Sequence, residues 1–213
     1  MMIARMTLLV SLVLAAGATL AQKPQFAPRE KLRVHSTFGF SLLPPPGQDW
    51  TEKFDDSAID YTKKTDPRQV SFYTQALLAN CTLPLPGKDG LLAFVRGKDE
   101  WGSDGRFKPV SSSFLPDPGQ STCVRYRMSV NDYGANNRSE HPFLVLHVVG
   151  RFCTHPQDAQ AVVDIAYSVR HVPGYDARAL EAEGEAFLDS LGFDPLPAGQ
   201  RKTAAFVKPC AHY

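Results

Sequence analysis

A serine and a histidine that could serve as nucleophile and general base stand at matching positions of two predicted strands. Ser129 lies in the alternating stretch 123–131, and His147 lies in the stretch 143–153. The next predicted strand adds Ser168 beside His147. Nucleophilic catalysis needs a base that a third group orients, and here the third position holds a serine in place of a carboxylate. A hydrolase that uses Ser129 and His147 is therefore the alternative hypothesis and not the leading one.

Basic side chains gather beside this row on the polar face of the predicted sheet. The four arginines are Arg125, Arg127, Arg151 and Arg170. With the polar faces of three strands aligned, Arg151 is expected near Asp164. The patch predicts a site for a small anionic ligand or for a partner protein, and a solvated sheet face is the other interpretation.

The register of the first two strands follows from two independent constraints. Setting Cys123 opposite Cys153 also aligns the apolar faces, because side chains alternate along a strand with a period of two. The apolar partners are Val124 with Phe152, Met128 with Val148 and Val130 with Leu146. The sequence therefore predicts a cross-strand disulfide, Cys123–Cys153.

The other two cysteines, Cys81 and Cys210, are predicted to form a second disulfide that tethers the C-terminal tail. No Cys-x-x-Cys spacing occurs in the chain. Among the histidines at strand ends, only His141 and His171 are expected to approach each other, and two ligands are too few for a metal site. The sequence therefore predicts no metal and no cofactor.

Residues 1–21 are predicted to be a cleaved signal peptide. Arg5 precedes an apolar run that is shorter than the roughly 20 residues that span a bilayer, and small residues precede Gln22. Removal of Arg5 changes the 23 basic and 22 acidic side chains to 22 of each, a balance that favours neither nucleic acid nor an anionic membrane. The mature protein is expected to be soluble, without a membrane anchor, and periplasmic or secreted. Asn80 and Asn137 begin glycosylation acceptor patterns, which matter only in a eukaryotic secretory pathway.

After an extended lead, residues 22–36, the pattern predicts one α+β domain over 37–193 and a tail over 194–213. The predicted strands are 37–43, 57–63, 69–78, 107–115, 123–131, 143–153 and 161–171, and the predicted helices are 89–101 and 176–191. One helix between the third and fourth strands and one after the last indicate an antiparallel sheet of about six to seven strands with a C-terminal helix packed on it.

The closing helix is predicted to cover the sheet. Its inward residues fall at helical spacing: Leu180, Gly184, Phe187, Leu188 and Leu191. The expected receiving face carries Tyr126, Met128, Val148, Ile165 and Tyr167. Phe187 should be buried there, while Asp189 should face away from the sheet. Asp176 is the expected N-cap, and Gly192 is the expected C-terminal stop.

Two short phrases frame this domain. The first is Phe38-Gly39-Phe40-Ser41-Leu42-Leu43-Pro44, followed by Gly47 and Trp50, and the second is Phe187-Leu188-Asp189-Ser190-Leu191-Gly192-Phe193. With the order of elements between them, these phrases resemble the PsbP-like fold group. Its members often begin with an aromatic strand ending in Pro and then Gly-Trp, and they close with a helix ending in a Ser-aliphatic-x-Phe phrase. The group contains photosystem accessory subunits, small-GTPase-binding proteins and bacterial envelope proteins, without shared catalytic residues. The resemblance implies an α+β fold and assigns no site.

The leading functional hypothesis from the sequence is an exported, non-catalytic binding or accessory protein of the cell envelope. Its expected partner is an envelope protein or a small anionic ligand, bound through one face of the sheet. The observation behind this hypothesis is a clear export signal and disulfide pattern beside an incomplete catalytic set.

Overall fold

The computed structural model describes residues 32–36, 39–54, 58–66, 70–80, 83, 87–97, 105–134 and 141–196. All of them belong to the compact unit that begins at Lys31. The predicted signal peptide, both members of the predicted pair Cys81–Cys210, and Asn137 lie outside the described residues. The signal peptide, the second disulfide and the tethered tail therefore stay predictions.

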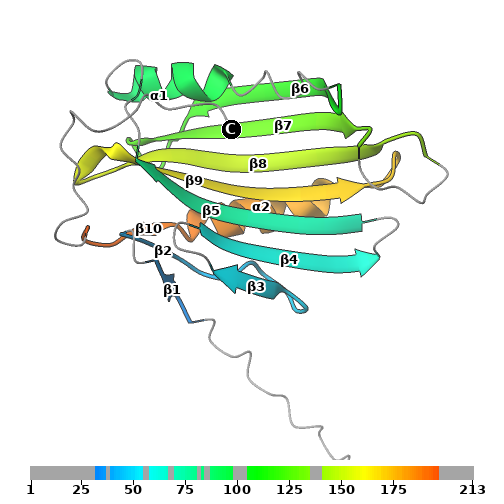
Figure 1. Ribbon diagram of the computed structural model, residues 1–213, viewed down its shortest axis with the longest axis horizontal. Coiled ribbons are helices and arrows are strands. Elements are labelled where there is room, and N and C mark those ends of the chain that lie inside the picture. Colours follow the sequence, from blue (N-terminus) through cyan, green and yellow to red (C-terminus); the bar gives the residue numbers. More distant parts are fainter. Residues whose placement is uncertain are drawn as a thin grey trace, which may run out of the picture. The chain divides into compact units, whose positions relative to one another are not determined.

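Seven of the described strands form one antiparallel sheet (Figure 1). They are β3 (Thr51–Phe54), β4 (Ala58–Asp66), β5 (Val70–Asn80), β6 (Phe107–Pro116), β7 (Cys123–Asp132), β8 (Leu144–His155) and β9 (Asp158–His171), in the order β3-β4-β5-β9-β8-β7-β6. β9 is the last of them in sequence, yet it lies in the middle of the sheet, between β5 and β8. The predicted α+β class is confirmed, since two helices accompany this sheet in the described part of the chain.

A second, small sheet holds the N-terminal strands. It consists of β1 (Val34–His35), β2 (Phe40–Leu42) and β10 (Gly192–Phe193), in the order β1-β2-β10. The sequence analysis expected the strand at 37–43 in a single sheet, and this was wrong. It also missed β1, β3 and β10, because strands of two to four residues are too short to show a period of two.

Both predicted helices form, with shifted ends. They are α1 (Gly87–Arg96) and α2 (Arg178–Asp189). Ala177, and not Asp176, occupies the N-cap position of α2, and it makes no side-chain cap hydrogen bond. Ser190, and not Gly192, caps the other end: its hydroxyl donates to the carbonyl oxygen of Phe187 at 2.6 Å and accepts from the amide of Leu43 at 3.1 Å.

The register predicted for β7 and β8 is confirmed, with Cys123 opposite Cys153 and every predicted apolar pair in place. A disulfide joins the two cysteines, whose Cα atoms lie 4.1 Å apart. The amide of Cys123 donates to the carbonyl of Gln120, and the carbonyl of Cys123 accepts from the amide of Asp117. Because these groups are engaged on the β6 side, the cysteines face each other at a narrow, non-hydrogen-bonded pair of the ladder.

The facing predicted for β9 was wrong. Arg151 pairs with Ile165 and His147 pairs with Val169, so neither meets a polar residue of β9. The polar residues of β9 point to the other face of the sheet: Asp164, Ser168 and Arg170. The central strand aims its apolar side chains at α2, and burying them outweighs the alignment of polar residues that the sequence analysis assumed.

Each helix covers its own face of the sheet, and each face has its own core. On what we call the α1 face, Leu91, Phe94 and Val95 of α1 pack with Val124, Tyr126, Met128, Val130, Leu146 and Val148. On the α2 face, Phe187 and Leu188 of α2 pack with Val149, Val163, Ile165, Tyr167 and Val169. The prediction that Phe187 is buried is confirmed, at 1% exposure. The receiving face predicted for this helix combined residues from both sides of the sheet. Ile165 and Tyr167 lie on the α2 face, whereas Tyr126, Met128 and Val148 lie on the α1 face.

Two glycines permit the closest contacts between these layers. A Cβ on Gly184 of α2 would lie 2.6 Å from Cγ2 of Val149 and 3.0 Å from Cδ1 of Tyr167, so the helix backbone rests directly on the sheet. On the α1 face, the ring of Tyr126 lies across Gly150 and leaves no room for a Cβ there. Glycine at these two positions is therefore required by packing.

Replacing Phe187 with alanine tests the packing of α2. Phe187→Ala should lower the free energy of unfolding by about 3–5 kcal/mol, the usual range for a core phenylalanine. The exposed position Ala182 supplies the control, and Ala182→Ser should cost about 0.5 kcal/mol or less. Chemical denaturation of both variants measures the difference. Equal, small effects would mean that α2 does not cover this face.

Candidate functional site

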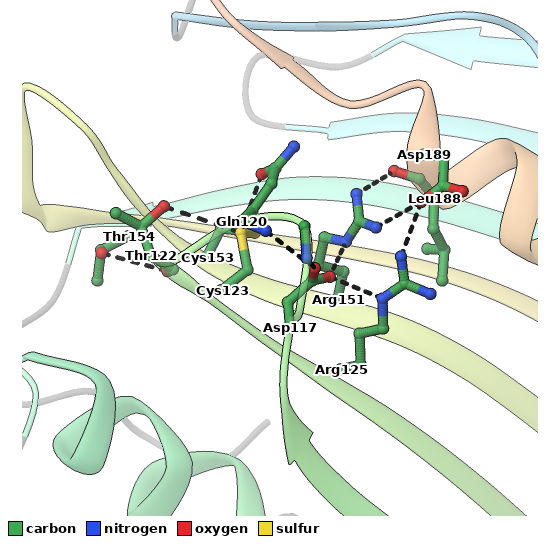
Figure 2. The surroundings of a disulfide bond; sticks show 11 residues. Asp117, Gln120, Thr122, Cys123, Arg125, Arg151, Cys153, Thr154, Leu188 and Asp189 are labelled. Carbon is green, nitrogen blue, oxygen red and sulfur yellow. Dashed lines mark hydrogen bonds and ion pairs between the residues drawn. A yellow bond between two sulfur atoms is a disulfide. The ribbon is translucent and has the colours of Figure 1, made fainter.

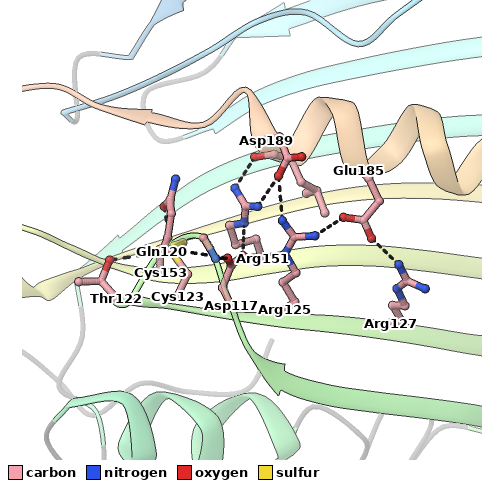
Figure 3. A network of polar contacts seen from close by, with 12 residues as sticks. Asp117, Gln120, Thr122, Cys123, Arg125, Arg127, Arg151, Cys153, Glu185 and Asp189 are labelled. Carbon is pink, nitrogen blue, oxygen red and sulfur yellow. Dashed lines mark hydrogen bonds and ion pairs between the residues drawn. A yellow bond between two sulfur atoms is a disulfide. The ribbon is translucent and has the colours of Figure 1, made fainter.

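The predicted arginine patch lies on the α2 face, and acidic side chains of α2 fill it (Figure 3). Arg125 donates to Glu185 at 2.6 Å and to Asp189 at 2.8 Å. Arg127 donates to Glu185 at 2.6 Å and lies 3.7 Å from Glu181. The acidic residues recur every fourth position on one flank of the helix, so they face the arginines of β7 and β8 together.

A buried aspartate in the turn before β7 closes the inner end of this network (Figure 2). The side chain of Asp117 is 0% exposed and that of Arg151 is 2% exposed, and Asp117 Oδ2 lies 2.7 Å from Arg151 Nε. Arg125 Nε donates to the same carboxylate oxygen at 2.7 Å. The other oxygen accepts from the amides of Gly119 and Gln120. Arg151 also donates to the carbonyl of Leu188 at 2.8 Å and to Asp189 at 2.6 Å.

The charges of this cluster leave no surplus for an anion. The three arginines of the α2 face meet four carboxylates, those of Asp117, Glu181, Glu185 and Asp189. Burial by itself would raise the pKa of Asp117. The hydrogen bond from Arg125, the Gly119 amide and the nearby charges outweigh burial and hold that pKa below its usual range. The cations of the predicted anion-binding patch are thus paired with carboxylates of the protein itself, and they seat the helix.

Arg170 does not belong to the patch at all. It lies on the α1 face, where its Nη2 is 2.9 Å from Asp132 Oδ2. Arg106 donates to both oxygens of the same carboxylate, from Nε at 3.0 Å and from Nη2 at 3.2 Å. The amide of Gly134 donates to Oδ1 of Asp132 at 3.0 Å. Asp132 at the end of β7 thus repeats the arrangement of Asp117 before β7: a buried carboxylate held by two arginines and by turn amides.

Ser129 and His147 do lie opposite each other, as predicted. Among the described residues, however, no hydrogen bond joins them and no carboxylate holds the His147 ring. The ring of His147 stacks on that of His171, with centroids 5.0 Å apart. Burial, followed by the proximity of His171, lowers the pKa of His147 against the opposing effect of Glu181. Ser168 lies on the other face, opposite Val148. The arrangement lacks the orienting group that nucleophilic catalysis needs.

A second set of catalytic residue types meets between the small sheet and the segment after β10, and the sequence analysis missed it. His35 Nδ1 lies 2.9 Å from Asp194 Oδ2, and Ser41 donates to Asp194 Oδ1 at 3.3 Å. The carboxylate sits between serine and histidine, whereas an activated serine needs the histidine in the middle. Ser41 is also buried, at 2% exposure. This set joins β1, β2 and the end of the domain and shows no catalytic geometry.

The residues that decide the site were visible in the sequence but unassigned. Asp117 stands in the turn Pro116-Asp117-Pro118-Gly119, and the acidic residues of α2 repeat at 181, 185 and 189. The sequence analysis placed Asp189 on an outward flank, and this was wrong, since Asp189 binds both Arg125 and Arg151. Matching a helical acidic stripe to the arginines of the sheet would have found the network.

Among the described residues, no group of three or more histidine, cysteine, aspartate or glutamate side chains has the geometry to hold a metal ion. No helix within the described ranges is both long and apolar enough to span a membrane.

Comparisons with known proteins assign no family to this chain. No protein-family model matches the chain, and no curated protein matches it. Among solved structures, the Saccharomyces cerevisiae Ran-binding protein Mog1p is similar, with 9% sequence identity over 73% of this chain and 90% of that chain and a TM-score of 0.42. A point mutant of Mog1 gives a TM-score of 0.45 at 9% identity, over 76% of this chain and 95% of that chain. Likeness at this level shows neither a family nor a function.

The buried carboxylate makes the stability of the fold depend on pH in a defined direction. The pKa of Asp117 is lower in the folded protein than in the unfolded chain, so its contribution is complete above the ordinary aspartate pKa of about 3.9. It is lost as the pH falls through the lower, folded value. Asp117→Asn should cost about 3–5 kcal/mol at neutral pH, as the loss of one member of a buried pair does. It should also weaken the fall in stability below pH 4.

Urea unfolding from pH 7 to pH 2 measures both effects. Asp49→Asn is the matched control, because Asp49 is exposed and its positive φ of 66° suits asparagine. An Asp117→Asn protein as stable as wild type, with an unchanged acid limb, would contradict the role given to this carboxylate.

Proposed function

We propose that the chain is an exported, non-catalytic binding protein that recognises a partner protein with its folded domain. The buried disulfide Cys123–Cys153 supports export, because such bonds persist mainly in oxidising compartments. The signal-like pattern of residues 1–21 points the same way. A periplasmic or secreted location, with a role in the cell envelope, is part of this proposal.

The observation that carries the non-catalytic part is the internal pairing of the polar cluster. Arg125, Arg127 and Arg151 are all bound by carboxylates of the protein itself. Ser129 and His147 face each other without an orienting carboxylate among the described residues. A side chain that already has its partner inside the fold is a poor candidate for binding a substrate.

The outer strand β6 supplies the contact surface in this proposal. Eight of its ten residues are exposed, namely the run from Lys108 to Ser113 and the pair Leu115 and Pro116, and only Phe107 and Phe114 are half-buried. Val110 is 61% exposed and Leu115 is 63% exposed, high values for apolar side chains in a strand. Exposed apolar residues on a rigid strand suit a protein partner better than a small ligand, since no surrounding walls are needed.

Affinity capture with matched variants tests the proposal. The wild-type chain, bound to a resin, should retain one partner protein in near-equal amount from an extract of the cells that make it. Leu115→Asp should lose this partner, because a charge would be buried in the contact. Phe54→Asp, at the 53% exposed Phe54 of β3, should retain it. The opposing result is an absence of partner together with hydrolytic turnover that His147→Ala abolishes. That result would favour an envelope hydrolase.

A further inference from the structure

Three rings lie in contact where the chain passes from the sheet to α2, those of His147, His171 and Tyr175. His171, the last residue of β9, is 2% exposed. The ring of His147, on the neighbouring strand β8, is stacked on that of His171, with centroids 5.0 Å apart and an angle of 21° between the ring planes. The ring of Tyr175, in the segment that leads to α2, lies 5.2 Å from that of His171 at an angle of 36°. The stack therefore connects the α2 face of β8 to the segment that starts the helix.

The hydrogen bonds around His171 restrict which of its ring nitrogens carries a hydrogen. Nδ1 of His171 lies 2.7 Å from the carbonyl oxygen of Val172, so this nitrogen carries the hydrogen that the carbonyl accepts. Nε2 of His171 is buried and has no hydrogen-bond partner. A hydrogen on that nitrogen would be a buried donor without an acceptor, which folded proteins avoid. The neighbouring His147 is half-buried and is the ring that solvent reaches first.

The two ends of α2 are held by different means. The C-terminal end is bound by Arg151 at the Leu188 carbonyl, by Arg33 at the Ser190 carbonyl at 2.7 Å, and by the Ser190 hydroxyl. At the N-terminal end, the cap residue Ala177 makes no side-chain hydrogen bond. The contact between the rings of Tyr175 and His171 joins the incoming segment to the sheet. Two ion pairs also hold this half of the helix: Glu181 lies 3.7 Å from Arg127, with both side chains more than half exposed, and Glu183 lies 3.4 Å from Lys63. Because an exposed ion pair such as the first contributes little, the start of the helix is the end that a local change can release.

We propose that the stacked rings of His147, His171 and Tyr175 form an acid-sensitive latch that holds the start of α2 closed at neutral pH and releases it in acid. Opening separates the rings and admits water, so the half-buried ring of His147 can take a proton. The end of α2 stays bound to Arg151 and Arg33. Acid therefore uncovers the part of the α2 face around His147 without unfolding the domain.

The titratable groups that act on the ring of His147 are His171 of β9 and Glu181 of α2, and Tyr175 lies beyond His171. Glu181 favours the protonated form of His147, but Glu181 also faces Arg127 at 3.7 Å. Burial and His171 prevail, and the pKa of His147 is lowered in the closed state. A group with a lowered histidine pKa stabilises the closed state above the ordinary value of about 6.5. This stabilisation declines as the pH falls below that value.

Amide hydrogen exchange at pH 7.5 and pH 5.0 tests the latch. Protection factors, which correct for the intrinsic effect of pH on exchange, should fall in the first turn of α2. The expected fall is about tenfold for each unit by which the His147 pKa is lowered. The last turn of α2 should keep its protection. His147→Gln should give the same first-turn protection at both pH values, and the exposed His141 provides the control, since His141→Gln should behave as wild type.

Three results would overturn the latch: unchanged first-turn protection in acid, an equal loss at both ends of α2, or a pH effect that His147→Gln leaves intact. If His147→Gln does not fold, the wild-type ring signals give the answer by nuclear magnetic resonance. The His147 titration and the shift of the first-turn amides should then share one midpoint below pH 6.5, and separate midpoints would contradict the proposal.

Discussion

The ion pair between Asp117 and Arg151 is the contact on which the position of α2 depends. Both side chains are removed from water, where an unpaired charge is costly. Arg151 reaches onward to Asp189 and to the Leu188 carbonyl, so one guanidinium ties the turn before β7 to the end of the helix. The disulfide beside this turn fixes β7 against β8 and so fixes the strand that carries Arg151. Charge pairing and the disulfide thus set where the apolar stripe of α2 can pack.

The sheet separates two kinds of interface. On the α1 face, the apolar side chains of β7 and β8 meet the apolar stripe of α1. The α2 face carries the apolar residues of β9 beside the arginines of β7 and β8. Phe187 of α2 packs on the apolar part, and the acidic flank of α2 pairs with the arginines. Its other flank carries Glu183, 3.4 Å from Lys63 of β4. The basic patch on β7 and β8 therefore seats the helix, whereas the edge strand β6 keeps Val110 and Leu115 exposed.

Sequence reasoning succeeded where two constraints agreed. The pairing of Cys123 with Cys153 was predictable because the covalent bond and the apolar alternation demand the same register. The facing of β9 rested on one assumption, that polar residues share a face, and the burial of Ile165 and Tyr167 against α2 overrode it. The short strands of the small sheet depend on contacts distant in sequence, such as Ser41 with Gly192, which no local pattern reveals. The acidic stripe of α2 was readable, but only the structure shows which arginines it meets.

The position given to α2 requires that Arg151 acts on Asp117 within the fold. A double-mutant cycle with Arg151→Met, Asp117→Asn and the combined variant measures this by chemical denaturation at neutral pH. We expect a coupling free energy of about 2–3 kcal/mol, at the upper end for residues in contact, with the double variant less destabilised than the sum of the single variants. A coupling near zero, with each single variant costing under about 0.5 kcal/mol, would contradict it and would return these arginines to the list of candidate ligand-binding residues.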